Sequence, residues 1–146
     1  MSAGGRLLAV DWGERRIGLA LSDETQTLAQ PLATLTRRAG KRFPMAQLLE
    51  HITRNHVTGV VVGLPLDEAG AEGEAARAAR ALADDIKRRA GDLPVTLWDE
   101  RMTTARVLAA IREMGGSTRG RKEDVDAMAA ALLLQHYLDA RRGSAV

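Results

Sequence analysis

The sequence predicts an α/β domain built on a mixed β-sheet with helices on its faces. Two observations predict it. Two apolar runs separated by one tight turn, residues 6–11 and 16–22, are typical of a β-hairpin. Later apolar runs alternate with amphipathic segments, and such an alternation favours parallel strands joined by helices. At 146 residues the chain fits one domain, 1–146, and it contains no internal repeat or linker.

Four strands and one helix are predicted in the first half of the chain. A third strand over 30–36 contains Pro31, which cannot donate to a neighbour and therefore favours an edge or a strand end. Apolar residues at 45, 48, 49 and 52 have helical spacing, which predicts a helix within 43–56. The continuous apolar run 58–64 predicts a central strand that is covered on both faces.

The second half is predicted to add one strand and three helices. In chain order we expect an alanine-rich helix over 74–90, a strand over 94–98, a helix from Thr103 to about 114, a glycine-rich basic loop over 115–121, and a last helix from 122 to about 141. The hydroxyl of Thr103 can accept the free N–H groups of a first helical turn.

The composition excludes several classes of protein. The chain has no cysteine, which excludes disulfides, thiolate zinc sites and cysteine nucleophiles and fits a cytoplasmic location. The three histidines show no zinc-ligand spacing, so we interpret them as structural or surface residues. Apolar runs stay well short of the roughly 18–20 residues that span a bilayer, so no membrane partner is expected.

The charges favour a polyanionic partner. Three of the 21 basic residues are lysine and the others are arginine, whose planar fork of donors matches phosphate. The alternative is that arginine is only the default surface cation of this chain. Basic residues gather in the predicted loops, whereas acids gather in 67–74 and at the ends of three elements. Aromatic residues make up only 3%, which favours recognition of a nucleic-acid backbone over base stacking.

Three acids stand at the edges of apolar elements. Asp11 ends the first strand, Glu100 follows the strand 94–98, and Asp126 lies in the apolar last helix. An isolated buried carboxylate is costly unless it is paired or binds a cation. Carboxylate oxygens are ligands that Mg²⁺ prefers, so the three acids predict a divalent cation held between them.

Each acid also has a simpler interpretation. Asp11 is alternatively a turn or capping acid, although its apolar lead-in favours a functional role. Asp99 and Glu100 together are alternatively an acid pair that favours the start of a helix. Asp126 is alternatively a solvated first-turn acid. Its helical face also contains the small residues Ala129 and Ala130, which would let the helix approach the sheet.

These segments together resemble the YqgF/RuvX family, proposed nucleases of pre-16S ribosomal RNA that are also similar to Holliday junction resolvases. The resemblance is carried, in order along the chain, by Leu8–Gly13, Arg16–Asp23, Ala29–Leu32, Val61–Leu66, Glu72–Gly73, Leu97–Thr104, Val125–Ala130 and Leu134–Asp139. Each segment alone is a weak signal, but all of them in order are specific. One departure is Trp12, where the family often has a small or β-branched residue. We expect the Trp12 indole either to lie over a sugar of the substrate or to pack under the turn.

The resemblance implies an RNase H-like fold with its core at about 6–140 and a five-stranded mixed sheet of order 3-2-1-4-5 flanked by helices. It implies that Asp11, Glu100 and Asp126 are the catalytic, metal-binding acids, with Mg²⁺ or Mn²⁺ as cofactor. It implies a metal-dependent endonuclease that matures the 5′ end of 16S ribosomal RNA in the bacterial cytoplasm. We expect the basic residues that contact phosphate to be among Arg16, Arg101, Arg119, Arg121 and Lys122.

Three other functions remain open from the sequence. The first is resolution of Holliday junctions, which requires a homodimer because two sites must face one junction. The second is a non-catalytic factor that binds RNA or assembles with ribosomal proteins. The third is a lobe of an actin-like or sugar-kinase ATPase, whose phosphate loop is similar to Asp11-x-Gly13. One lobe of 146 residues is too short for that activity.

Overall fold

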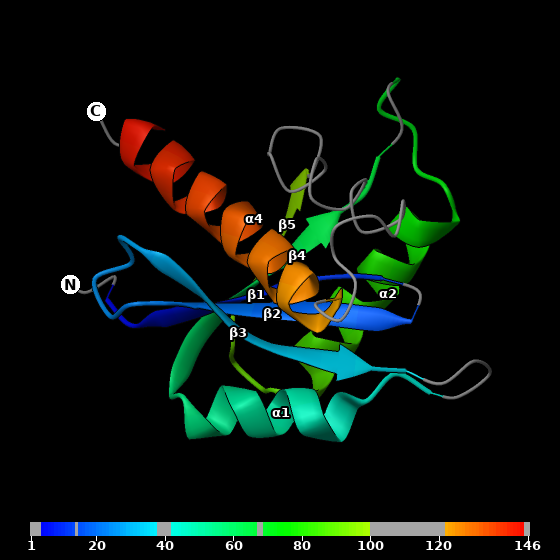
Figure 1. The fold of residues 1–146 in the computed structure, drawn as a ribbon, viewed down its shortest axis with the longest axis horizontal. Helices are drawn as coiled ribbons and strands as arrows, with labels where there is room; N and C mark the ends of the chain where they lie inside the picture. The colour runs from blue at the N-terminus through cyan, green and yellow to red at the C-terminus, as the bar shows by residue number, and fades with distance from the viewer. Residues whose placement is uncertain (1–3, 14, 38–41, 67–68, 100–121, 145–146) are drawn as a thin grey trace.

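A mixed five-stranded sheet forms the centre of the protein (Figure 1). The structure is a computed structural model, and it describes residues 4–13, 15–37, 42–66, 69–99 and 122–144. The sheet order is β3-β2-β1-β4-β5, as the family resemblance implies. The strands are β1 (Arg6–Asp11), β2 (Arg16–Ser22), β3 (Ala29–Thr36), β4 (Val57–Leu64) and β5 (Val95–Asp99).

Pairing in this sheet is mixed because the two halves of the chain are connected differently. The tight turn after β1 makes β1 and β2 antiparallel, and β3 pairs antiparallel with β2. Helical crossovers make β4 parallel to both β1 and β5. The carboxyl ends of β1, β4 and β5 therefore meet at one edge, where Asp11 and Asp99 end their strands.

Helices cover both faces of the sheet (Figure 1). Helices α1 (Met45–Arg54) and α2 (Glu74–Arg89) lie on one face, and the long helix α4 (Lys122–Ser144) crosses the other. Side chains alternate along β1, so Leu8 and Val10 pack on the α1 and α2 side while Leu7 and Ala9 pack on the α4 side. Two covered faces explain the uninterrupted apolar runs 7–10 in β1 and 59–64 in β4. No helix in the described parts of the chain is long and apolar enough to cross a membrane.

The predicted elements are confirmed with small shifts at their ends. Strand β3 lies at the edge of the sheet, where Pro31 can be accommodated beside a register shift in β2. The helix expected within 43–56 begins after Pro44, and α4 extends three residues beyond the predicted 141. Both the helix expected over 103–114 and the basic loop 115–121 lie outside the described residues.

A hydrogen-bonded turn connects β2 to β3. One carboxylate oxygen of Asp23, Oδ1, accepts the backbone N–H groups of Thr27 at 2.7 Å and Leu28 at 3.1 Å, and Oδ2 accepts the hydroxyl of Thr25 at 2.6 Å. Gln135 of α4 then fastens this turn, since its amide donates to the Thr27 carbonyl and accepts the Ala29 N–H, both at 2.9 Å. The turn thereby links the edge of the sheet to α4.

Replacing Asp23 by Asn is expected to destabilise the protein at pH 7 and to have a much smaller effect near pH 2. The hydroxyl of Thr25 and the N–H groups of Thr27 and Leu28 lower the pKa of Asp23 from 3.8 to about 2. A depressed pKa stabilises the fold above the unfolded value of 3.8, and this stabilisation disappears as the pH falls through about 2. Urea unfolding of both proteins between pH 2 and 7 measures the difference. A difference that is independent of pH would contradict this role of the charge.

Candidate active site

Two buried carboxylates lie on the α4 side of the sheet. Asp11 is 5% exposed and Asp126 is 1% exposed, and among the described residues these are the buried charged side chains. Asp11 is two residues beyond Ala9, which packs against α4, so alternation along β1 places Asp11 on that same face. Asp126 lies near the start of α4, and its predicted face is confirmed because Ala129, Ala130 and Leu133 are fully buried.

Gly18 brings the two acids together. In the antiparallel ladder Gly18 is the direct partner of Asp11, so both residues face α4. A Cβ atom at position 18 would stand only 2.0 Å from the backbone oxygen of Asp126 and 2.6 Å from its carbonyl carbon. The backbone of α4 therefore lies directly on Gly18, and Asp126 is adjacent to the residue opposite Asp11. This contact was not predicted, because a single glycine in a hairpin strand is a weak signal.

Gly13 allows the tight return from β1 to β2. A Cβ atom there would lie 2.2 Å from the backbone oxygen of Arg16, so a larger residue would clash with the turn itself. The return places Arg16 at the start of β2, two residues before Gly18 and on the same side of the sheet. Gly13 thus helps to bring a basic side chain to the end of β1 where Asp11 lies.

Arg16 forms an ion pair with Asp126. Its Nε donates to Oδ2 of Asp126 at 2.7 Å, and the Arg16 side chain is 29% exposed. The pair supplies the counter-charge that a buried carboxylate requires. Arg16 was expected to contact phosphate, which stays a prediction, and the structure gives it an acidic partner at the site.

Most of the other predicted site residues lie outside the described residues. Glu100 follows β5 directly, and it lies outside the described residues together with Arg101, Arg119 and Arg121. Lys122 begins α4. Asp99 is less suitable as a third acid, because Leu97 packs on the α1 and α2 side and Trp98 packs on the α4 side. By alternation Asp99 faces away from Asp126.

The donors at this edge fit a hard divalent cation. Mg²⁺ and Mn²⁺ bind oxygen ligands, and Mg²⁺ usually takes only one or two carboxylates. Asp11 and Asp126 supply two such groups from separate elements in a buried setting. Within the described ranges no cluster of three acids or histidines forms a metal site, so these residues alone provide a partial ligand set.

Trp12 packs under the turn, which is one of the two alternatives that the sequence left open. Its ring stacks on Phe43 with centroids 5.8 Å apart and an angle of 18° between planes, and the Arg37 guanidinium lies 5.4 Å from the Trp12 ring centre. Both rings pack against the cluster beneath α1 and α2. Trp12 therefore supports the end of β1 from the face opposite Asp11.

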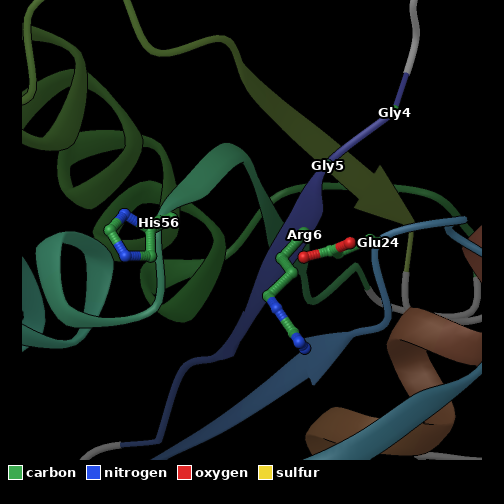
Figure 2. A pocket seen from close by; sticks show the side chains of 5 residues that line it. All are labelled: Gly4, Gly5, Arg6, Glu24 and His56. Carbon is green, nitrogen blue, oxygen red and sulfur yellow. The ribbon is translucent and has the colours of Figure 1, made fainter.

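A separate cavity of about 370 Å³ lies at the other end of β1, beside the amino end of that strand (Figure 2). It is lined by Gly4, Gly5, Arg6, Glu24 and His56. Because Arg6 begins β1 and Asp11 ends it, the length of the strand separates this cavity from the acids. His56 lines this cavity and is exposed, as expected for a surface residue.

The fold and the buried acids define a class before any relative is considered: an RNase H-like α/β domain with carboxylates at the carboxyl edge of its sheet. Solved structures agree on the fold. Thermus thermophilus RuvC in complex with a Holliday junction substrate superposes with a TM-score of 0.60 and 19% identity, covering 95% of this chain and 96% of that chain. A second structure of Thermus thermophilus RuvC gives a TM-score of 0.53.

Sequence comparison then identifies the family. The family model described as "RuvX: Holliday junction resolvase" matches residues 5–140. A Koribacter versatilis protein named "Putative pre-16S rRNA nuclease" is 43% identical over 139 residues, covering 95% of this chain and 89% of the relative. A relative of the same name from Anaeromyxobacter sp. is 42% identical over 136 residues, covering 93% and 98%. The chain belongs to the RuvX family, whose relatives are named as nucleases.

Proposed function

We propose that this protein is a metal-dependent endonuclease that hydrolyses phosphodiester bonds in structured RNA, and that it matures the 5′ end of precursor 16S ribosomal RNA. The observation that carries the proposal is the pair of buried carboxylates, Asp11 and Asp126, at the carboxyl edge of the sheet. Buried carboxylates require compensating positive charge, and a divalent cation bound between Asp11 and Asp126 would supply it to both. The names of the relatives support the RNA substrate.

In this proposal Asp11, Asp126 and Glu100 are the catalytic acids that hold Mg²⁺ or Mn²⁺. When bound, the cation supplies polarisation of the phosphate and activation of the attacking water. Asp11 and Asp126 are positioned by rigid elements, since β1 is paired on both sides and α4 rests on Gly18. Arg101, Arg119, Arg121 and Lys122 are proposed to contact phosphates of the substrate, in the way guanidinium and ammonium groups do elsewhere.

Chelation of divalent metal is expected to abolish cleavage. The purified chain would be incubated with a labelled 5′-extended 16S precursor fragment and, in parallel, with small ribosomal subunits that contain the same precursor. The expected result is a defined cut with Mn²⁺ or Mg²⁺ and at least a 10³-fold lower rate in EDTA, because the charge on the phosphate is then uncompensated. The subunit substrate tests whether ribosomal proteins are required. Cleavage that is equally fast in EDTA would contradict the metal dependence.

The second candidate function is resolution of four-way DNA junctions. The description of the family model and the fold of RuvC favour it. Resolution requires two sites on one junction and therefore a homodimer, which light scattering at micromolar concentration can detect. Paired symmetric nicks in a synthetic junction by a dimer would support this function. Binding of RNA without cleavage of either substrate would instead support a non-catalytic assembly factor.

A further inference from the structure

The ion pair between Arg16 and Asp126 raises a conflict at the proposed metal site. Oδ2 of Asp126 accepts the Nε–H of Arg16 at 2.7 Å, yet the same carboxylate is one of the groups proposed to hold a divalent cation. We propose that Arg16 is an exchangeable counter-ion of Asp126, which neutralises this carboxylate in the metal-free protein and releases it when the cation binds. This inference rests on the proposed function.

Arg16 is placed where it can exchange partners. It begins β2 beside the turn, and it is followed by Ile17, which is fully buried and anchors the strand. The Arg16 side chain is 29% exposed, whereas Asp126 is 1% exposed, so the arginine approaches the acid from the solvent side. The strand and the helix can therefore stay in place while the guanidinium moves toward solvent.

The energetics favour competition over joint binding. A guanidinium and a divalent cation on one carboxylate repel each other, and little solvent is present around Asp126 to screen them. Without a bound cation, the ion pair of Arg16 with Asp126 stabilises the fold, because a buried carboxylate without a counter-charge is costly. Arg16 is thus expected to stabilise the metal-free protein and to weaken the binding of metal.

A purely positioning role predicts the opposite sign. If Arg16 only held Asp126 in the orientation that metal needs, removing it would weaken metal binding. In the exchange, removing Arg16 strengthens metal binding because the guanidinium no longer competes with the cation for Asp126. The affinity for the metal ion alone therefore distinguishes the two roles without any measurement of cleavage.

The test is a titration of the full chain with Mn²⁺, followed by the electron paramagnetic resonance signal of the free ion at pH 8. Arg16→Met has a similar length and no charge, and it is expected to bind Mn²⁺ about tenfold more tightly than wild type, because the competing charge-assisted hydrogen bond to Asp126 is removed. Arg16→Lys retains the charge and is expected to stay within about threefold of wild type. Arg54→Met removes an exposed ion pair on α1 and is the matched control, with unchanged affinity expected.

Thermal unfolding gives a second readout. In EDTA, Arg16→Met is expected to unfold at a lower temperature than wild type, and saturating Mn²⁺ is expected to raise its midpoint by more than it raises that of wild type. In an Asp126→Asn background, Arg16→Met is expected to change neither the unfolding midpoint in EDTA nor its rise with Mn²⁺. The carboxylate for which Arg16 and the cation compete is absent there. If Arg16→Met does not fold, Arg16→Gln provides the same comparison.

Three results would overturn the exchange. Equal or weaker Mn²⁺ binding by Arg16→Met, with normal binding by wild type, would reject the exchange and leave the proposed nuclease intact. Absence of Mn²⁺ binding by the folded wild-type protein would reject the exchange together with the metal-dependent function. Tighter Mn²⁺ binding by both Arg16→Met and Arg54→Met would show a general effect of lost positive charge, and it would also reject the exchange.

Discussion

Asp11→Asn is expected to abolish cleavage of the precursor RNA while the protein remains folded. The substitution keeps the shape of the side chain and removes its charge at the carboxyl end of β1, where Asp11 is 5% exposed. An amide is a poor ligand for a hard cation compared with a carboxylate. Loss of several kcal/mol of charge stabilisation at the phosphate corresponds to a rate about 10³-fold lower, since each 1.36 kcal/mol is a factor of ten.

The control for this prediction is stability in EDTA. Replacing a buried carboxylate by a neutral amide of equal size removes a desolvation cost, so the unfolding midpoint of Asp11→Asn is expected within a few degrees of wild type. The cleavage rate and the unfolding curve would be measured on the same preparation. Asp11→Asn that cleaves at the wild-type rate would remove Asp11 from the catalytic set. A loss of both activity and fold would instead indicate a structural role for its charge.

Much of the fold could be predicted from the sequence because its signals are local. Apolar runs, one tight turn and helical spacing predicted the described strands and helices with end shifts of a few residues. The buried face of α4 was also predicted, since Ala129, Ala130 and Leu133 recur at helical spacing with Asp126. The order of the strands came only from the family resemblance, because which strands pair is decided by contacts between distant residues.

The internal arrangement of the site could not be predicted in the same way. The sequence predicted that Asp11 and Asp126 share a cation and that the last helix approaches the sheet. The two acids are 115 positions apart, however, and the contact of α4 with Gly18 that sets their spacing was not predicted. The pairing of Arg16 with Asp126 also joins residues 110 positions apart. A sequence contains many acids that could pair with an arginine near a turn. Only the packed structure shows which of them lies close enough to do so. The expectation that Arg16 contacts phosphate could not anticipate this acidic partner.

Gly18→Ala is expected to be one of the most damaging single-methyl substitutions in the chain. The added Cβ would stand 2.0 Å from the backbone oxygen of Asp126 and 3.3 Å from the backbone nitrogen of Ala127. Both atoms belong to the main chain of α4, so no side-chain rotation can relieve the clash, and the helix itself must move. Overpacking against a rigid backbone costs about 3 kcal/mol, which urea unfolding would detect as a lower midpoint.

The same substitution is expected to lower cleavage even where the protein stays folded. A helix displaced by about 1 Å carries Asp126 away from Asp11, and misplacement of that size costs on the order of 10²-fold in rate. Gly59→Ala in β4 is the matched control. Its Cβ would meet Cδ2 of Leu7 at 2.9 Å, the end of a flexible side chain that can rotate, so a change of only about 1 kcal/mol and near-normal cleavage are expected. Equal effects of the two substitutions would mean that Gly18 matters only as a residue of the strand, and that close approach of α4 does not set the spacing of the two acids.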